Sequence, residues 1–105
     1  MLDKKQARQI AFEYADRVKQ TYNPKSVILF GSYVNGNPHD YSDIDIAIIF
    51  ESFEGDWLTT WANLVGIACD VDVMAGIEPH MFDETCNRSG FLDHIRKTGE
   101  VIYGG

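Results

Sequence analysis

Two aspartates stand two positions apart, Asp43 and Asp45, in the apolar segment "DIDIAIIF". In a strand, residues i and i+2 project to the same face. Asp is a poor strand former, so a pair of them indicates a task for negative charge, although a solvated strand face is the simpler alternative. Two carboxylates on one face can share Mg²⁺, which completes its ligand shell with water and phosphate oxygens. The pair therefore predicts a magnesium site that serves a phosphate-bearing substrate.

A second chemical feature is Gly31 followed by Ser32, directly after the apolar run "VILF". Serine is a good helix N-cap, and the free N–H groups of a helix N-terminus bind phosphate. A third is Asp72 in "CDVDVMA", where strand pairing would bring it beside the first two aspartates. Three carboxylates there would hold two ions about 4 Å apart, as two-metal enzymes do. Asp70, earlier in the same segment, is the other candidate for the third carboxylate.

The elements that must position these residues follow from the spacing of apolar side chains. The spacing predicts helices over 4–21, 33–35, 57–68, 81–85 and 90–98, and strands over 27–30, 43–50, 69–75 and 101–103. The segment 36–42 has the Gly, Asn, Pro and Asp residues of a turn. Helices and strands thus alternate, which predicts an α+β domain.

The length of 105 residues predicts a single domain, 1–105, with no room for a separate acceptor-binding domain. Hydrophobic residues make up 45% and charged residues 24%, as in ordinary globular proteins, and no apolar run has membrane-spanning length. The charged start lacks the apolar core of a secretory signal. We therefore expect a cytoplasmic protein without membrane contact, in which Cys69 and Cys86 are reduced thiols.

The distribution of charge restricts the ligands. The net charge is −7, and all nine basic residues lie at or before Lys25 or at or after Arg88. The centre of the chain thus carries carboxylates only, which argues against general nucleic-acid binding. A nucleotide would need divalent cations at such a surface.

The segment "GSYVNGNPHDYSDIDIAII" resembles the signature of the DNA polymerase β-type nucleotidyltransferase superfamily: Gly-Ser, ten residues, then Asp-x-Asp before an apolar strand. From about Ser26 to Tyr103 the chain is similar to its minimal nucleotidyltransferase (MNT) branch. The resemblance implies the polymerase β-like fold, a mixed sheet with helices mainly on one side. It also implies that Gly31 and Ser32 hold the triphosphate of ATP or another NTP. Asp43, Asp45 and Asp72 would be the catalytic residues and the ligands of two Mg²⁺ ions.

By the same resemblance, the chain would be an antitoxin component that transfers AMP to a hydroxyl of a helical partner of the HEPN family, in a homo- or hetero-oligomer. The sequence departs from the family pattern at Tyr33, Val34 and Asn35, where many relatives have an arginine or lysine. A non-catalytic nucleotide-binding regulatory subunit would explain that departure. An antibiotic-type transferase would share the chemistry but normally has an added acceptor domain.

One apolar set has two interpretations. Trp57, Trp61, Leu64 and Val65 share one side of the predicted helix 57–68. Such residues are usually core, but a short helix in a small domain cannot easily bury them all. They predict either a core face or a surface for a protein partner.

Overall fold

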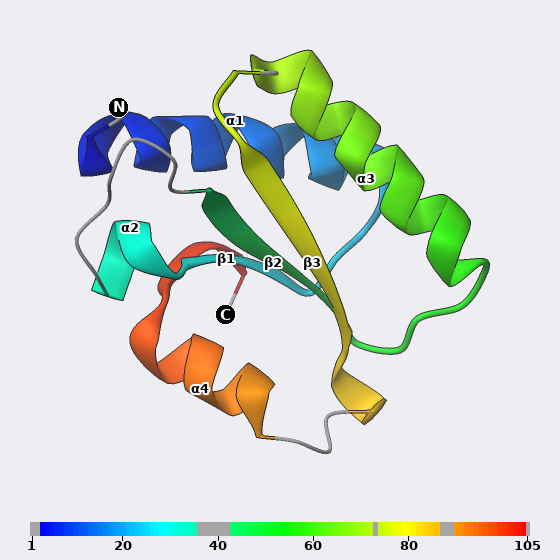
Figure 1. Ribbon diagram of the computed structural model, residues 1–105. Helices are drawn as coiled ribbons and strands as arrows, with labels where there is room; N and C mark the ends of the chain where they lie inside the picture. Colours follow the sequence, from blue (N-terminus) through cyan, green and yellow to red (C-terminus); the bar gives the residue numbers. More distant parts are fainter. Residues whose placement is uncertain (1–2, 36–42, 73, 87–89, 105) are drawn as a thin grey trace.

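The computed structural model describes residues 3–35, 43–72, 74–86 and 90–104. Its centre is a four-stranded sheet in the order β3-β2-β1-β4 (Figure 1). The strands are β1 (Ser26–Phe30), β2 (Ile44–Phe50), β3 (Ile77–Asp83) and β4 (Glu100–Gly104). β1 pairs antiparallel with β2 and β4, whereas β2 and β3 run parallel. The sheet is therefore mixed, as predicted.

The helices are α1 (Lys4–Thr21), α2 (Ser32–Asn35), α3 (Trp57–Asp72) and α4 (Phe91–Thr98), with a short 3-10 helix η1 (Glu84–Cys86). Figure 1 shows α1 and α3 on one side of the sheet and α4 on the other. The predicted α+β class, with helices mainly on one side, is confirmed. The turn predicted over 36–42 lies outside the described residues. Within the described residues, no helix is both long and apolar enough to span a bilayer.

The alternation of β2 divides the core between the two faces of the sheet. Ile44, Ile46 and Ile48 are fully buried on the α1 and α3 side. Ala47 and Ile49 are fully buried in a second cluster with Leu92 and Ile95 of α4. Asp45 lies on the same face of β2 as Ala47 and Ile49, because alternate residues of a strand share a face. Its carboxylate therefore belongs to the face that the shorter helix α4 covers only in part.

Helix α1 is fixed at its start and at its middle. The Gln6 N–H donates to Asp3 Oδ1 (2.7 Å) and the Asp3 N–H donates to Gln6 Oε1 (3.0 Å), which makes a capping box. The buried Tyr14 hydroxyl donates to the Leu64 carbonyl of α3 (2.9 Å). The two long helices are thereby joined into one layer over the sheet.

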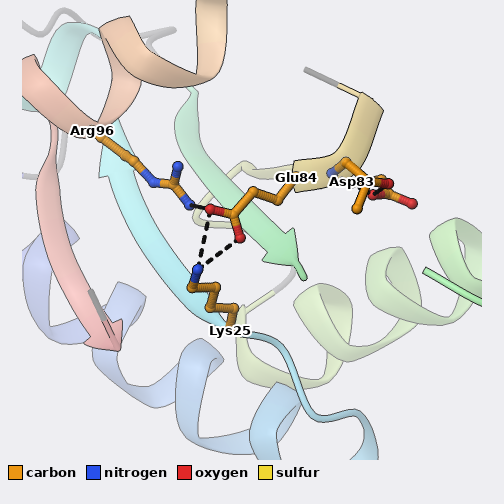
Figure 2. A network of polar contacts seen from close by, with 5 residues as sticks. Lys25, Asp83, Glu84 and Arg96 are labelled. Carbon is orange, nitrogen blue, oxygen red and sulfur yellow. Dashed lines mark hydrogen bonds and ion pairs between the residues drawn. The ribbon is translucent and has the colours of Figure 1, made fainter. Parts of the chain in front are cut away.

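An ionic network links three elements on the α4 side (Figure 2). Lys25 Nζ lies 2.8 Å from Glu84 Oε2, and Arg96 Nη2 lies 3.2 Å from Glu84 Oε1. The contacts join the residue before β1, η1 and α4. The hydrogen bond from Lys25 is the main cause that holds the pKa of Glu84 below its usual value. The neighbouring Asp83 accepts a hydrogen bond from the Phe53 N–H (2.9 Å), so the loop before α3 is also anchored here.

The strand predicted over 69–75 is wrong, and the helix predicted to end near Ala68 is longer than expected. Helix α3 continues to Asp72 because Leu64, Ala68 and Val71 keep the i, i+4, i+7 spacing of a buried helix face. The short alternation of polar and apolar residues in the sequence 70–73 fits both the strand period and the helix period. Contact with the core decides between a strand and a helix.

The third strand is β3, a segment in which the sequence predicted a loop and then, over 81–85, a turn of helix. Pro79 made a strand unexpected, since proline cannot donate to a ladder. β3 is an edge strand of the sheet, where proline is tolerated, and Pro79 is buried opposite Ile46. The helical turn occurs later, as η1 (Glu84–Cys86).

Candidate active site

Carboxylates gather where β2 and β3 begin. In the parallel register Asp45 is the partner of Glu78. Asp43, just before β2, is exposed and hydrogen-bonds with the side chain of Glu78. The two predicted aspartates are thus brought together, and Glu78 is a third carboxylate that the sequence analysis missed.

Glu78 could have been noticed only after β3 was recognised, because its position beside Asp45 depends on the strand register. Burial is the main cause that raises the pKa of Glu78, and the hydrogen bond with Asp43 raises it further. The negative charges of Asp45 and Asp43 act in the same direction, while His80 opposes them. Asp43, Asp45 and Glu78 therefore concentrate more negative charge than His80 offsets.

His80 completes the cluster, since it lies two positions after Glu78 on the same face of β3. Its Nε2 lies 3.1 Å from Asp45 Oδ1 and 4.0 Å from Glu78 Oε1. The hydrogen bond with Asp45 is the main cause that raises the pKa of His80, and the charges of Asp45 and Glu78 add to it against the effect of burial. One donor atom from each of Asp45, Glu78 and His80 lies within 4.8 Å of the others.

Gly31 directly follows β1 and lies against the second carboxylate oxygen of Asp45. Its φ is +84°, and a Cβ there would lie 2.3 Å from Asp45 Oδ2. Only glycine allows the backbone to adopt this conformation without strain and to approach the carboxylate so closely. The Gly-Ser turn and the Asp-x-Asp segment are therefore in contact, as their combination in one site requires.

Comparison with known proteins identifies the family. The family model "Polymerase beta, Nucleotidyltransferase" matches residues 13–105. The chain belongs to this family. Among curated proteins, no significant match was found.

Two solved structures share the fold of this nucleotidyltransferase. A protein from Sulfolobus solfataricus, named as a candidate nucleotidyltransferase, is 22% identical, with a TM-score of 0.68 over 96% of this chain and 83% of that one. The toxin-antitoxin MntA-HpeT, solved as a mutant, is 21% identical, with a TM-score of 0.63 over 90% of this chain and 73% of that one. At these identities the two structures support the fold.

Asp72, the predicted third carboxylate, is a helical residue of the nucleotidyltransferase and not a strand residue. It is the last residue of α3, it is exposed, and its Oδ1 accepts a hydrogen bond from the Met74 N–H (3.0 Å). Its predicted strand pairing beside Asp43 and Asp45 is wrong, because α3 continues through it and Asp45 pairs with Glu78. Asp70 is also part of α3 and is exposed.

Basic side chains approach α2 from a distant part of the sequence. Lys4, Lys5 and Arg8 of α1 line a cavity together with Tyr33 and Val34 of α2. Arg8 Nε is already paired with Glu100 (2.8 Å). The segment that lacks the arginine of many relatives therefore lies next to cations, which sequence order alone did not indicate.

Aromatic rings flank the imidazole of His80. Phe30 contacts His80 edge to face, with ring centroids 5.1 Å apart, and Phe91 of α4 contacts Phe30 in the same way at 6.2 Å. Phe30 is partly buried and Phe91 is exposed. The nucleotidyltransferase site thus combines charged side chains with aromatic rings on the side toward α4.

Proposed function

We propose that this nucleotidyltransferase moves a nucleoside monophosphate, AMP from ATP, to a hydroxyl of a helical protein partner of the HEPN type, as an antitoxin component. The observation that carries the proposal is the convergence of Asp43, Asp45 and Glu78 at one end of β2 and β3. The structural neighbour MntA-HpeT is a toxin-antitoxin, which supports an antitoxin role with a protein partner. Its mutant replaces two aspartates, two positions apart, by glutamate, and Asp43 and Asp45 have the same spacing.

The donor set fits a divalent cation. After burial, the main cause, the side chains of Asp43 and Asp45 raise the pKa of Glu78 further, and a cation would offset the repulsion between these negative charges. Mg²⁺ is the ion that the family resemblance implies. When bound, a divalent ion supplies charge stabilisation to the transferring phosphate and the departing pyrophosphate.

In the proposed reaction the acceptor oxygen forms a bond to the α-phosphorus of ATP, and the bond from that phosphorus to the bridging oxygen breaks. Pyrophosphate leaves with the electron pair. The hydroxyl proton moves to Glu78, the carboxylate that lies opposite Asp45 in the register of the sheet. Gly31 and Ser32 would hold the triphosphate, and Asp43 and Asp45 the metal. Glu78 takes the role that the sequence analysis assigned to Asp72.

A non-catalytic regulatory subunit is the second candidate. It is favoured by the absence of Lys and Arg from Ser26 to Asn87 in the sequence, which leaves the central acidic segment without its own triphosphate-binding cation. Such a subunit would bind ATP with a divalent ion and transfer nothing.

The test is co-expression with the protein encoded beside this chain, incubation with ATP and Mg²⁺, and intact mass of the partner. Mass gains of whole AMP units are expected with the wild type and none with the Asp43→Asn, Asp45→Asn double variant. Glu78→Gln should slow transfer by about 10²-fold or more, the range of lost general-base catalysis. Asp72→Asn should transfer at close to the wild-type rate.

Transfer that survives the double variant would refute the enzymatic proposal. ATP binding without any transfer would support the regulatory subunit. A loss in Asp72→Asn together with normal transfer in Glu78→Gln would return the third-carboxylate role to Asp72.

A further inference from the structure

The donor set at the start of β3 differs from an all-carboxylate magnesium site because it includes a nitrogen. Asp45 and Glu78 offer carboxylate oxygens, and His80 offers Nε2. We propose that His80 is a direct metal ligand, so that this site takes a first-row transition-metal dication such as Mn²⁺ in preference to Mg²⁺. The use of that ion in catalysis rests on the proposed function, whereas its binding rests on the cluster alone.

The spacing of the donor atoms suits one shared ion. Two ligands that each lie about 2.1 Å from a metal are between about 3.0 and 4.2 Å apart when their angle at the metal is between 90° and 180°. The observed distances from His80 Nε2 are 3.1 Å to Asp45 Oδ1 and 4.0 Å to Glu78 Oε1. Both fall within that range, and the third pair of donor atoms, from Asp45 and Glu78, lies within 4.8 Å.

The surroundings keep the imidazole in this place. Glu78 and His80 are two positions apart on β3, so they share a face, and Asp45 is fixed opposite Glu78 by the register of the sheet. The ring of Phe30 packs against the imidazole, and Gly31 allows close approach to the other Asp45 oxygen. The side chains of Asp45 and His80 are 25% and 33% exposed, so water and a metal ion reach them. The ligands therefore come from regular secondary structure, which holds a metal site more precisely than a loop does.

The chemistry of the donors determines which ion is preferred. Imidazole suits transition-metal dications such as Zn²⁺, Fe²⁺ and Ni²⁺, whereas carboxylates and water suit Mg²⁺, Ca²⁺ and Mn²⁺, and Mn²⁺ is the transition-metal ion among the latter. A set of two carboxylates and one imidazole favours ions that accept both donors. A plain hydrogen bond between His80 and Asp45 is the alternative explanation of the 3.1 Å contact, and it predicts no change in metal preference when His80 is replaced.

The experiment is titration of the purified full chain with Mn²⁺, with electron-spin-echo modulation to detect a nitrogen bound to the ion. The chain has three histidines, so the His39→Asn, His94→Asn double variant leaves His80 as its only imidazole. We expect nitrogen modulation in the wild type and in that double variant, and none in His80→Asn. Competition by Mg²⁺ gives the preference for Mn²⁺, which should fall at least tenfold in His80→Asn and stay unchanged in the double variant.

Bound Mn²⁺ without nitrogen modulation in the wild type would overturn the inference, and so would an unchanged Mn²⁺ to Mg²⁺ preference in a folded His80→Asn variant. Absence of Mn²⁺ binding would overturn it as well. None of these readouts involves ATP. Nitrogen-bound Mn²⁺ in a chain that transfers no nucleotide would therefore support this inference while refuting the proposed enzyme. Transfer with Mg²⁺ and no nitrogen signal would do the opposite.

Discussion

At the scale of single residues, Asp45 is the centre of the site. One carboxylate oxygen lies beside His80 Nε2, and the other faces the Cα of Gly31. Glu78 is its partner in the adjacent strand. A carboxylate with these contacts has little freedom to move, so small changes at its neighbours should alter the site more than changes elsewhere on the surface.

Gly31→Ala tests this restriction. A Cβ would meet Asp45 Oδ2 at 2.3 Å and would stand on a backbone with φ of +84°. We expect the free energy of unfolding to fall by about 1–3 kcal/mol, the usual cost of such backbone strain, as measured by chemical denaturation. Mn²⁺ affinity should fall at least tenfold, because the carboxylate must move away from its ligand position.

The matched control is Gly55→Ala. Its φ is +120°, but the nearest atom to an added Cβ is Phe53 Cζ at 3.9 Å, so it has the backbone strain without the close contact. Gly55→Ala should lose stability and keep Mn²⁺ affinity. Equal losses of Mn²⁺ affinity in the two variants would show that contact with Asp45 is not the cause.

At the scale of elements, η1 connects the strand that contains Glu78 and His80 to the side of the sheet covered by α4. Glu84 forms ion pairs with Lys25, the residue before β1, and with Arg96 of α4, as Figure 2 shows. Glu84 and its two partners come from three separate segments of the chain. The network therefore holds the end of β3 in position relative to α4.

Glu84→Gln should lower the thermal midpoint by a few degrees at pH 7. In the folded state, the hydrogen bond from Lys25 lowers the pKa of Glu84 below its ordinary value of 4.5. The ion pairs therefore stabilise the fold fully above pH 4.5. That contribution disappears as pH falls through the lower, folded-state pKa. Differential scanning calorimetry from pH 7 to pH 3 should show the wild-type and variant midpoints converging.

Glu54→Gln is the control, since Glu54 is exposed and has no ion pair among the described residues. It removes the same charge without breaking a network. A Glu54→Gln variant with the same loss at pH 7, or a Glu84→Gln loss that does not change with pH, would contradict the interpretation of the network.

At the scale of the whole molecule, the outer surface of α3 distinguishes the two interpretations of its apolar residues. Leu64 is fully buried in the core and Val65 is partly buried, whereas Trp57 and Trp61 are each 44% exposed and Leu58 is 71% exposed. The set thus divides into a core face and an exposed apolar surface. Interface anchors are enriched in tryptophan, and this surface suits the protein partner of the proposed function.

Trp61→Ala should weaken the complex with the co-expressed partner by about 30-fold or more, the effect of losing a hot-spot residue of at least 2 kcal/mol. Size-exclusion chromatography and calorimetry would measure it. Met74→Ala is the control, because Met74 is 89% exposed and follows the C-terminal end of α3, whereas Trp61 is near its start. A complex that tolerates Trp61→Ala as well as Met74→Ala would place the partner elsewhere on the molecule.

The sequence by itself determined the elements and motifs that depend on local patterns of residues. The helix over 4–21 and the strand β1 follow from apolar periodicity, and the Gly31, Ser32 turn and the Asp43, Asp45 pair follow from residue type and spacing. These signals depend on neighbours within a few positions, so no tertiary contact is needed to recognise them. The predicted α+β class followed from the order of such elements.

The tertiary structure decided where two patterns competed and which distant residues meet. Packing of Ala68 and Val71 against the core extended α3 to Asp72. A position at the edge of the sheet allowed the segment around Pro79 to form a strand. The register of that strand brought Glu78 and His80 to Asp45, although Asp45 and Glu78 are 33 positions apart in the sequence. Strand register is set by the burial of whole faces of a sheet, and no short segment contains that information.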